Sequence, residues 1–290
     1  MTLRFAYNTN GAANHRLDDA IRLIHTAGYD GVALTLDIHH LDPFADGWAT
    51  EAGRVASLLE KLELGCVIET GARFLLDPTA KHEPTLVSAD GAGRARRVGF
   101  LKRAVEIGAM LSAEAVSFWA GVPKPGVDHR EARIWLLEGL REVAAFAEAT
   151  GVTPCLEPEP GMLIETLDDF TALDVPGLRL ALDTGHCLVT GEREPADAVR
   201  EFARRVGTVS IEDMRRGAHV HLPFGEGDMD VGGVLGALEE VGYGKLVCVE
   251  LSRESHRADV MIPQALDYLR RCRRPGPDLA AEQETRRQWQ

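Results

Sequence analysis

The sequence predicts a single α/β domain, a (βα)8 TIM barrel with its active site at the carboxyl ends of the strands. Strand-like and helix-like patterns alternate along the whole chain, without an internal repeat or a domain linker. The length of 290 residues suits one such barrel, which commonly takes about 250 residues. Four strand-like runs in the second half each end on an acidic residue.

The first half of the chain contains four of the predicted strand–helix units. Gly28, Gly65 and Gly151 directly follow three of the predicted helices, and glycine commonly ends a helix. Segment 71–93 has prolines, mixed charges and no clear period, so we expect a long functional loop there. In chain order, the predicted strands and helices of this half are 3–8, 17–27, 31–36, 51–64, 66–70, 94–110, 114–119 and 129–150.

The second half contains strands that end on Glu157, Asp183, Glu212 and Glu250. Because side chains alternate along a strand, each acid shares a face with the small residue two positions before it. Small residues suit a barrel interior, and the intervening Leu, Ile and Val would then face the outer helices. The strand runs are 155–157, 180–183, 210–212 and 248–250, and helices are predicted near 167–173, 195–206, 231–241 and 259–271.

Composition and charge argue against several classes of protein. The net charge of −13, from 45 acidic against 32 basic residues, argues against a nucleic-acid surface. No apolar run approaches the roughly 18 residues that a membrane span needs. Five cysteines without a CxxC spacing, and an N-terminus without a signal peptide's apolar region, predict a reduced, cytoplasmic protein. The barrel is predicted over residues 1–274, with a charged tail over 275–290.

Carboxylates and imidazoles gather near the carboxyl ends of the second-half strands. His186 follows Asp183 by one helical turn, and His219 and His221 lie on one side of an extended segment. This collection predicts a divalent-metal site at the mouth of the barrel. The candidate metal ligands are Glu157, Asp183, His219, His221 and Glu250.

At these residues the chain resembles the xylose isomerase-like TIM-barrel superfamily, which includes the sugar phosphate isomerases and epimerases. The resemblance covers nearly the whole chain but depends on the second half. It implies one divalent metal (Mn, Mg, Co, Fe or Zn) held by Glu157, Asp183 and Glu250. It also implies that Glu157 and Glu250 act as an acid/base pair and that His186 orients the substrate.

The chain departs from the family pattern at the third metal ligand. The family often has a histidine on the seventh strand, where this chain has Ser210, and a serine is a poor metal ligand. His219 or His221 could replace it, because a related branch binds metal through a pair before a Gly-Glu-Gly turn. Glu212 is the other possible replacement.

The leading hypothesis is a metal-dependent isomerase or epimerase that acts on a small polyhydroxylated carbonyl compound through an enediolate. His186, Arg216, Arg73 and Lys81 are the candidate substrate contacts, the last two for a phosphate or carboxylate. A lyase on the same scaffold and a non-catalytic metabolite-binding barrel are the alternatives. An endonuclease IV-like phosphodiesterase is disfavoured because the early strands lack its extra histidines. A homodimer is left open.

Overall fold

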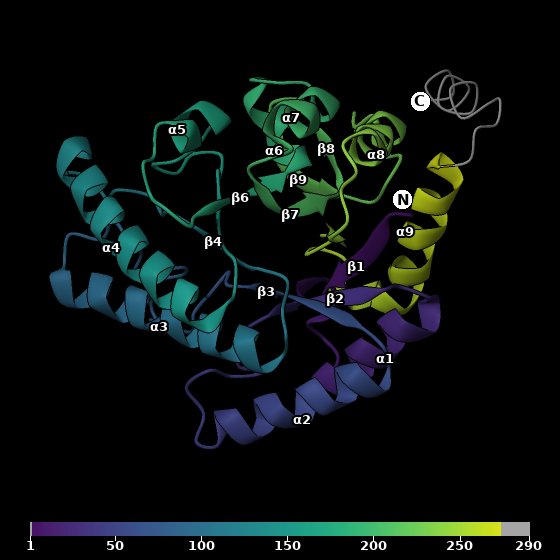
Figure 1. Ribbon diagram of the computed structural model, residues 1–290, viewed down its shortest axis with the longest axis horizontal. Helices are drawn as coiled ribbons and strands as arrows, with labels where there is room; N and C mark the ends of the chain where they lie inside the picture. Colours follow the sequence, from purple (N-terminus) through teal and green to yellow (C-terminus); the bar gives the residue numbers. More distant parts are fainter. Residues whose placement is uncertain (1, 274–290) are drawn as a thin grey trace.

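The computed structural model describes residues 2–273 and confirms the predicted fold. Eight parallel strands close into a barrel in the order β1-β10-β7-β6-β5-β4-β3-β2, and β1 pairs with β2 to complete the ring (Figure 1). The predicted tail over 275–290 lies outside the described residues. The barrel strands are β1 (Arg4–Asn8), β2 (Gly31–Thr35), β3 (Gly65–Glu69), β4 (Val116–Trp119), β5 (Pro154–Glu157), β6 (Arg179–Asp183), β7 (Val206–Ile211) and β10 (Leu246–Val249).

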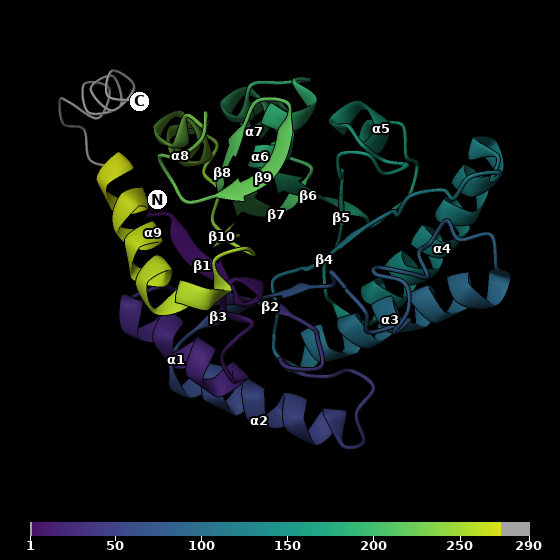
Figure 2. The ribbon, with the colours of Figure 1, turned by 180° about the vertical axis from the view of Figure 1, so that it is seen from behind.

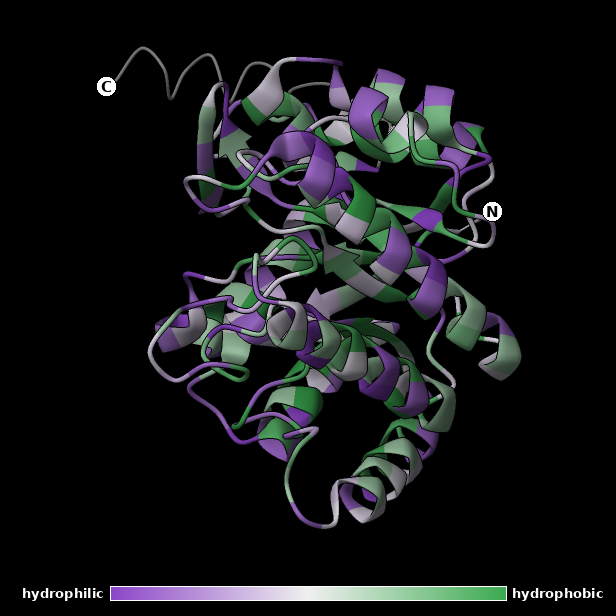
Figure 3. Cartoon of the chain, turned by 90° about the vertical axis from the view of Figure 1, so that its left-hand side faces the viewer, coloured by the Kyte–Doolittle hydropathy of each residue, from purple (hydrophilic) through white to green (hydrophobic). Residues whose placement is uncertain are grey.

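Helices connect successive strands and cover the outside of the barrel (Figures 1 and 2). In Figure 3 these helices are striped, with hydrophilic and hydrophobic residues interleaved, as expected for helices with one buried face. Among residues 2–273, no helix is long and apolar enough to cross a membrane. The main helices are α1 (Leu17–Ala27), α2 (Trp48–Lys61), α3 (Gly91–Met110), α4 (His129–Thr150), α5 (Leu167–Thr171), α7 (Pro195–Phe202), α8 (Val231–Glu240) and α9 (Ala258–Cys272).

Two helices begin earlier than the sequence pattern predicted. Helix α3 begins at Gly91 rather than at residue 94, because the Asp90 side chain accepts hydrogen bonds from the N–H groups of Ala92 and Gly93. The glycines in this first turn are weak helix formers, so the sequence pattern did not indicate that the helix begins there. Helix α2 likewise begins at Trp48, three residues before the predicted start.

The connections at the carboxyl ends of β6 and β7 contain elements that the sequence pattern did not resolve. Helix α6 (Thr184–Thr190) follows β6 directly. After β7, the chain forms a two-stranded antiparallel hairpin from β8 (Asp213–Arg215) and β9 (Ala218–Leu222). One short 3₁₀ helix, η1 (Thr9–Ala12), follows β1, and another, η2 (Ser255–Arg257), precedes α9. All of these lie at or near the end of the barrel where the strands terminate.

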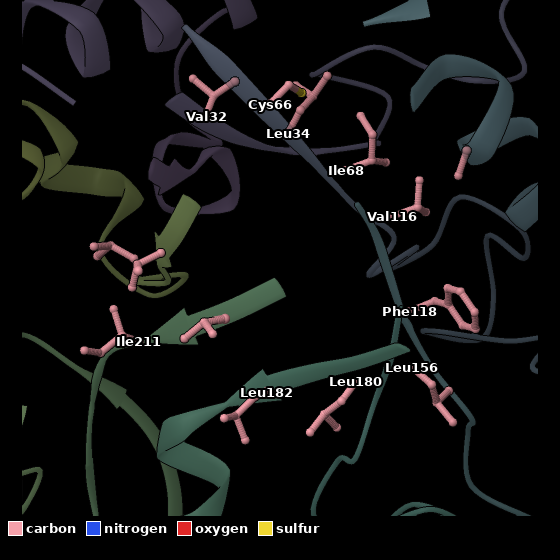
Figure 4. Packing of buried hydrophobic residues seen from close by; sticks show 14 of the residues in the cluster. Val32, Leu34, Cys66, Ile68, Val116, Phe118, Leu156, Leu180, Leu182 and Ile211 are labelled. Carbon is pink, nitrogen blue, oxygen red and sulfur yellow. The ribbon is translucent and has the colours of Figure 1, made fainter. Parts of the chain in front are cut away.

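Small side chains fill the inside of the barrel, as the alternation along the strands predicted. The larger apolar side chains of the same strands, such as Leu156, Leu182 and Ile211, point outward from the ring (Figure 4). Leu246 is the largest inner residue, and a Cβ on Gly31 would lie 2.6 Å from its Cδ1 atom. The inner cluster consists of Ala6, Ala33, Val67, Ala115, Cys155, Ala181, Leu246 and Cys248.

We expect Leu246→Ala to lower the free energy of unfolding by about 2–5 kcal/mol, because the small residues around it leave a cavity that cannot collapse. Ile134→Ala is the control: Ile134 is 56% exposed on α4, and its truncation should change stability by less than about 0.5 kcal/mol. Chemical denaturation of both variants measures the difference. Equal stability losses would mean that Leu246 does not fill the barrel interior.

Candidate active site

A cavity of about 580 Å³ opens at the carboxyl ends of the barrel strands. The strand ends and the loops that follow them supply its walls, which combine acidic, basic and imidazole groups with Phe118, Trp119 and Met162. It is lined by Asn8, Asn10, Thr35, Glu69, Thr70, Gly71, Arg73, Lys81, His82, Ser117, Phe118, Trp119, Glu157, Glu159, Met162, Asp183, His186, His219, His221, Glu250, Ser252 and Arg253.

Asp183 combines a structural and a free carboxylate oxygen. Its Oδ1 atom accepts hydrogen bonds from the N–H groups of Gly185 (2.7 Å) and His186 (3.1 Å) and so caps α6. Its Oδ2 atom is buried and has no hydrogen-bond partner among residues 2–273. Burial tends to raise the pKa of Asp183, but its neighbours, above all the His186 imidazole, hold it below its usual value. Asp183 therefore presents an ionised oxygen toward its acidic neighbours.

His186 lies at the centre of the acidic groups and is fixed by the main chain. Its Nδ1 atom lies 3.0 Å from the carbonyl oxygen of Pro158, which can only accept, so Nδ1 carries a hydrogen. Its Nε2 atom lies 3.6 Å from Asp183 Oδ2 and 3.8 Å from Glu159 Oε2. Burial lowers the pKa of His186, but these two carboxylates raise it by more, so the net shift is upward.

The glutamates around His186 are buried among like charges. Burial and the nearby Glu159 raise the pKa of Glu157 well above its usual value. Burial also raises the pKa of Glu159 to about 7, although the His186 imidazole partly offsets this. The same causes, burial and neighbouring carboxylates, raise the pKa of Glu69 and of Glu212. Burial and the neighbouring carboxylates therefore dominate the pKa shifts of these four acids.

Glu250 is held by a residue from the opposite end of the chain. The Asn10 side-chain amide donates a hydrogen bond of 2.9 Å to Glu250 Oε1. Asn10 is in turn fixed at the start of η1, where its main-chain N–H donates to Asn8 Oδ1. Sequence reasoning missed Asn10, because the closure of β1 against β10 brings these residues together across 240 positions.

Glu69 also belongs to the site, and sequence reasoning missed it. It ends β3, lines the cavity and is in phase with the inner residue Val67. The acid-ended strands were identified by a small residue two positions before the acid. In β3 this position is occupied by Val67, which is larger, so the pattern did not include Glu69. Strand parity alone would have identified Glu69.

The hairpin β8–β9 brings the two predicted histidines over the mouth. The ring centres of His219 and His221 are 5.3 Å apart, and those of His219 and His186 are 4.9 Å apart. His219 Nε2 lies 3.8 Å from Glu159 Oε1. Burial lowers the pKa of His219 to about 4, and the neighbouring imidazoles add to this effect. A neutral imidazole of this kind can coordinate a metal.

Three groups among the described residues could each hold a cation. In each group, one ligand atom from every member lies within 4.8 Å of the others. His219 belongs only to the group with Glu159 and His186, which does not include Glu250, and His221 lines the cavity without entering any of the three. The groups are Glu157–Asp183–His186, Asp183–Glu212–Glu250 and Glu159–His186–His219.

The structure places two of the predicted basic substrate contacts in the cavity and the third outside it. Arg73 and Lys81, from the long loop before α3, line the cavity, and Arg73 Nη1 lies 3.9 Å from Asp37 Oδ2. Arg216 lies on the turn of the β8–β9 hairpin, outside the cavity lining, where its Nη2 donates to Glu194 Oε2 at 2.8 Å. The structure does not bring Arg216 to the other site residues. Arg253 lines the cavity next to the hairpin.

The fold and cavity define an α/β barrel with an acidic site at the carboxyl ends of its strands, the end where barrel enzymes carry their active sites. The model of the xylose isomerase-like TIM barrel family matches residues 21–272, and the chain belongs to this family.

The chain is also similar to individual proteins. The chain is 23% identical over 243 residues to L-ribulose-5-phosphate 3-epimerase UlaE of Shigella flexneri, which covers 82% of each chain. The structure is similar to D-allulose 3-epimerase from Methylomonas sp., with a TM-score of 0.70, 20% identity and coverage of 93% and 98% of the two chains. It is also similar to the IolI protein with a bound zinc atom, with a TM-score of 0.74, 18% identity and coverage of 93% and 98%.

We expect Glu212→Gln to stabilise the metal-free protein at pH 8. Burial raises the folded-state pKa of Glu212, so above the ordinary glutamate pKa of about 4.3 the unfolded state loses this proton first. The wild type then loses about 1.4 kcal/mol of unfolding free energy per pH unit relative to the variant, until the folded-state pKa is reached. Below a pH of about 4.3, the carboxyl group is protonated in both states and the advantage disappears.

Denaturation at pH 5, 6.5 and 8 in the presence of a chelator measures this difference. Parallel pH profiles for the wild type and Glu212→Gln would show that Glu212 is not linked to folding through a proton.

Proposed function

We propose that this protein is a divalent-metal-dependent epimerase or isomerase of a small polyhydroxylated ketone. One observation carries the proposal: Glu157 and Glu250 reach one cavity from β5 and from the end of β10, strands that lie three apart in the ring of eight. Two carboxylates in such positions can reach opposite faces of a bound sugar. The similarity to sugar epimerases supports an enzyme of this kind.

The residues present fit a divalent cation. Buried atoms without a hydrogen-bond partner among residues 2–273 include Asp183 Oδ2, His186 Nε2 and both carboxylate oxygens of Glu212. Unpaired buried carboxylates are costly unless a counter-charge accompanies them. Glu157, Asp183 and Glu250 would hold the ion, which would polarise the substrate carbonyl and stabilise negative charge on its oxygens.

The two glutamates would exchange the proton on the carbon next to the carbonyl. Burial and Glu159 raise the pKa of Glu157, so its carboxylate is a stronger base than an ordinary glutamate once ionised. Glu250, oriented by the Asn10 amide, would deliver a proton to the opposite face of the resulting enediolate. Removal on one face and delivery on the other inverts the carbon.

Other residues would orient the substrate. His186 is locked by its Nδ1 hydrogen bond to Pro158, so its Nε2 atom points among the acids, where it can bind a sugar hydroxyl. Trp119 and Met162 supply apolar surface in the wall of the cavity. Arg73 and Lys81 place positive charge on the loop side, where they would bind a phosphate or carboxylate on the substrate.

Proton exchange in deuterium oxide tests this function. We expect the manganese-loaded protein to introduce deuterium at C3 of D-allulose or L-ribulose 5-phosphate while the C3 epimer accumulates. Glu157→Gln and Glu250→Gln should each lower kcat by about 100-fold or more, because each removes one acid/base group. NMR spectroscopy follows both exchange and epimer, and metal content measured in parallel separates loss of the base from loss of the ion.

The exposed Glu138 on α4 lies outside the cavity, so Glu138→Gln should retain wild-type activity. Deuterium uptake accompanied by loss of a hydroxyl would indicate a lyase instead. An absence of uptake with a panel of ketopentoses, ketohexoses and their phosphates would contradict the proposal.

We expect Arg73→Ala to raise KM for a phosphorylated ketose about tenfold or more, since a hydrogen bond to a charged group is lost. The KM for the unphosphorylated sugar should change little. Arg216→Ala is the matched control, because this arginine is exposed and paired with Glu194 outside the cavity lining. Steady-state kinetics with both sugars provides the comparison, and an equal effect of Arg73→Ala on both would rule out a phosphate contact.

A further inference from the structure

Glu212 is an acid buried completely at the end of β7, between the barrel and the hairpin. Its exposed fraction is 0%, and neither carboxylate oxygen has a hydrogen-bond partner among the described residues. A carboxylate in this position loses its hydration without gaining a donor, which is costly unless a counter-charge replaces the water. The position of Glu212 therefore calls for a cation or a proton.

The side chains that face Glu212 are acids rather than bases. An oxygen of Glu212 lies within 4.8 Å of oxygens from Asp183 and Glu250, which also lie within that distance of each other. Asp183 uses its Oδ1 atom to cap α6, and its Oδ2 atom remains without a partner in residues 2–273. Oxygens of divalent-ion sites lie about 2.0–2.6 Å from the ion, so three ligand oxygens can be separated by distances of this size.

The main chain leaves space for this carboxylate. A Cβ atom at Gly185, in the first turn of α6, would overlap Glu212 Oε1. The absence of a side chain there lets Glu212 approach Asp183 from the neighbouring strand. Gly185 thus shapes the site around an acid that contributes nothing to the apolar core.

Other donors in the same part of the fold are less suitable. Ser210 shares the strand face with Glu212 but offers only a hydroxyl, which is a poor ligand for a divalent ion. His219 groups with Glu159 and His186 instead of with Glu250. Among the described residues that follow β7, Glu212 alone has a ligand atom grouped with those of Asp183 and Glu250, and that ligand is a carboxylate.

We propose that Glu212 binds the divalent cation of the proposed function directly, together with Asp183 and Glu250. With Glu157, which the proposed function also assigns to the ion, the donor set would consist of carboxylate oxygens alone. Oxygen-only sites favour Mg²⁺ and Mn²⁺, whereas imidazole ligands favour Zn²⁺. The protein accordingly uses Mn²⁺ or Mg²⁺ in preference to Zn²⁺. This inference depends on the proposed function for the presence of an ion, and on the geometry of Glu212 for the choice of ligand.

Isothermal titration of the full-length, metal-free protein with Mn²⁺ tests the proposal. We expect the wild type to bind the ion and Glu212→Gln to bind it at least about tenfold more weakly, because the charge of the ligand set controls affinity. Glu69→Gln is the matched control: it removes another strand-end acid, which lines the cavity and is absent from all three ligand groups. Its effect on the Mn²⁺ Kd should be smaller than that of Glu212→Gln.

The Glu212→Gln variant separates a ligand from a positioning residue. If Glu212 instead kept a proton and donated it to Asp183, the introduced side-chain amide would donate in its place and Mn²⁺ affinity would stay at the wild-type value. That result, or an equal loss in Glu69→Gln, overturns the proposal and leaves the proposed function intact. A wild type that binds none of Mn²⁺, Mg²⁺, Co²⁺ and Zn²⁺ would overturn both.

A change of ligand provides a second readout that does not depend on loss of binding. Glu212→His should raise the affinity for Zn²⁺ relative to Mn²⁺ about tenfold or more, because it introduces an imidazole into an oxygen-only site. Unchanged relative affinities for the two ions would contradict direct contact between residue 212 and the metal. Circular dichroism of each variant establishes that it is folded.

Discussion

The gathering of carboxyl groups at one end of a closed ring is the constraint on which this structure depends. Strand closure sends every in-phase terminal side chain toward the same axis, and five of the strand ends carry an acid: Glu69, Glu157, Asp183, Glu212 and Glu250. Burial strengthens the repulsion among them. The available counter-charges are protons, the His186 imidazole, the basic side chains that line the cavity and, in the proposed function, a divalent cation. The chemistry of the site follows from this imbalance.

The rest of the barrel fixes the acids in place. Asp183 caps α6 with one oxygen while the other stays free, so a single residue serves both the helix and the site. Asn10 orients Glu250 from across the closure of the ring. Small inner residues such as Cys155 and Ala181 fill the space below the mouth. A rigid support of this kind keeps the acids together in spite of their repulsion.

Much of the site could be predicted from the alternation of side chains along the strands. The acid-ended strands of the second half identified Glu157, Asp183 and Glu250, and the structure brings all three to one cavity. Asn10 carried no comparable signal, since its contact with Glu250 arises only when β1 meets β10. The position of Arg216 depends on the path of the β8–β9 hairpin, and the local sequence pattern does not encode that path.

The sequence by itself determined the alternation of strands and helices, the inward face of each strand and hence the single barrel. These properties depend on side-chain periodicity, which is local and survives without knowledge of neighbours. Only the tertiary structure decided which polar groups meet. Whether Glu212, His219 or His221 stands beside Asp183 depends on ring closure and on the route of the β8–β9 hairpin. The distances that define a ligand set are set by packing between segments far apart in the chain, so no local pattern contains them.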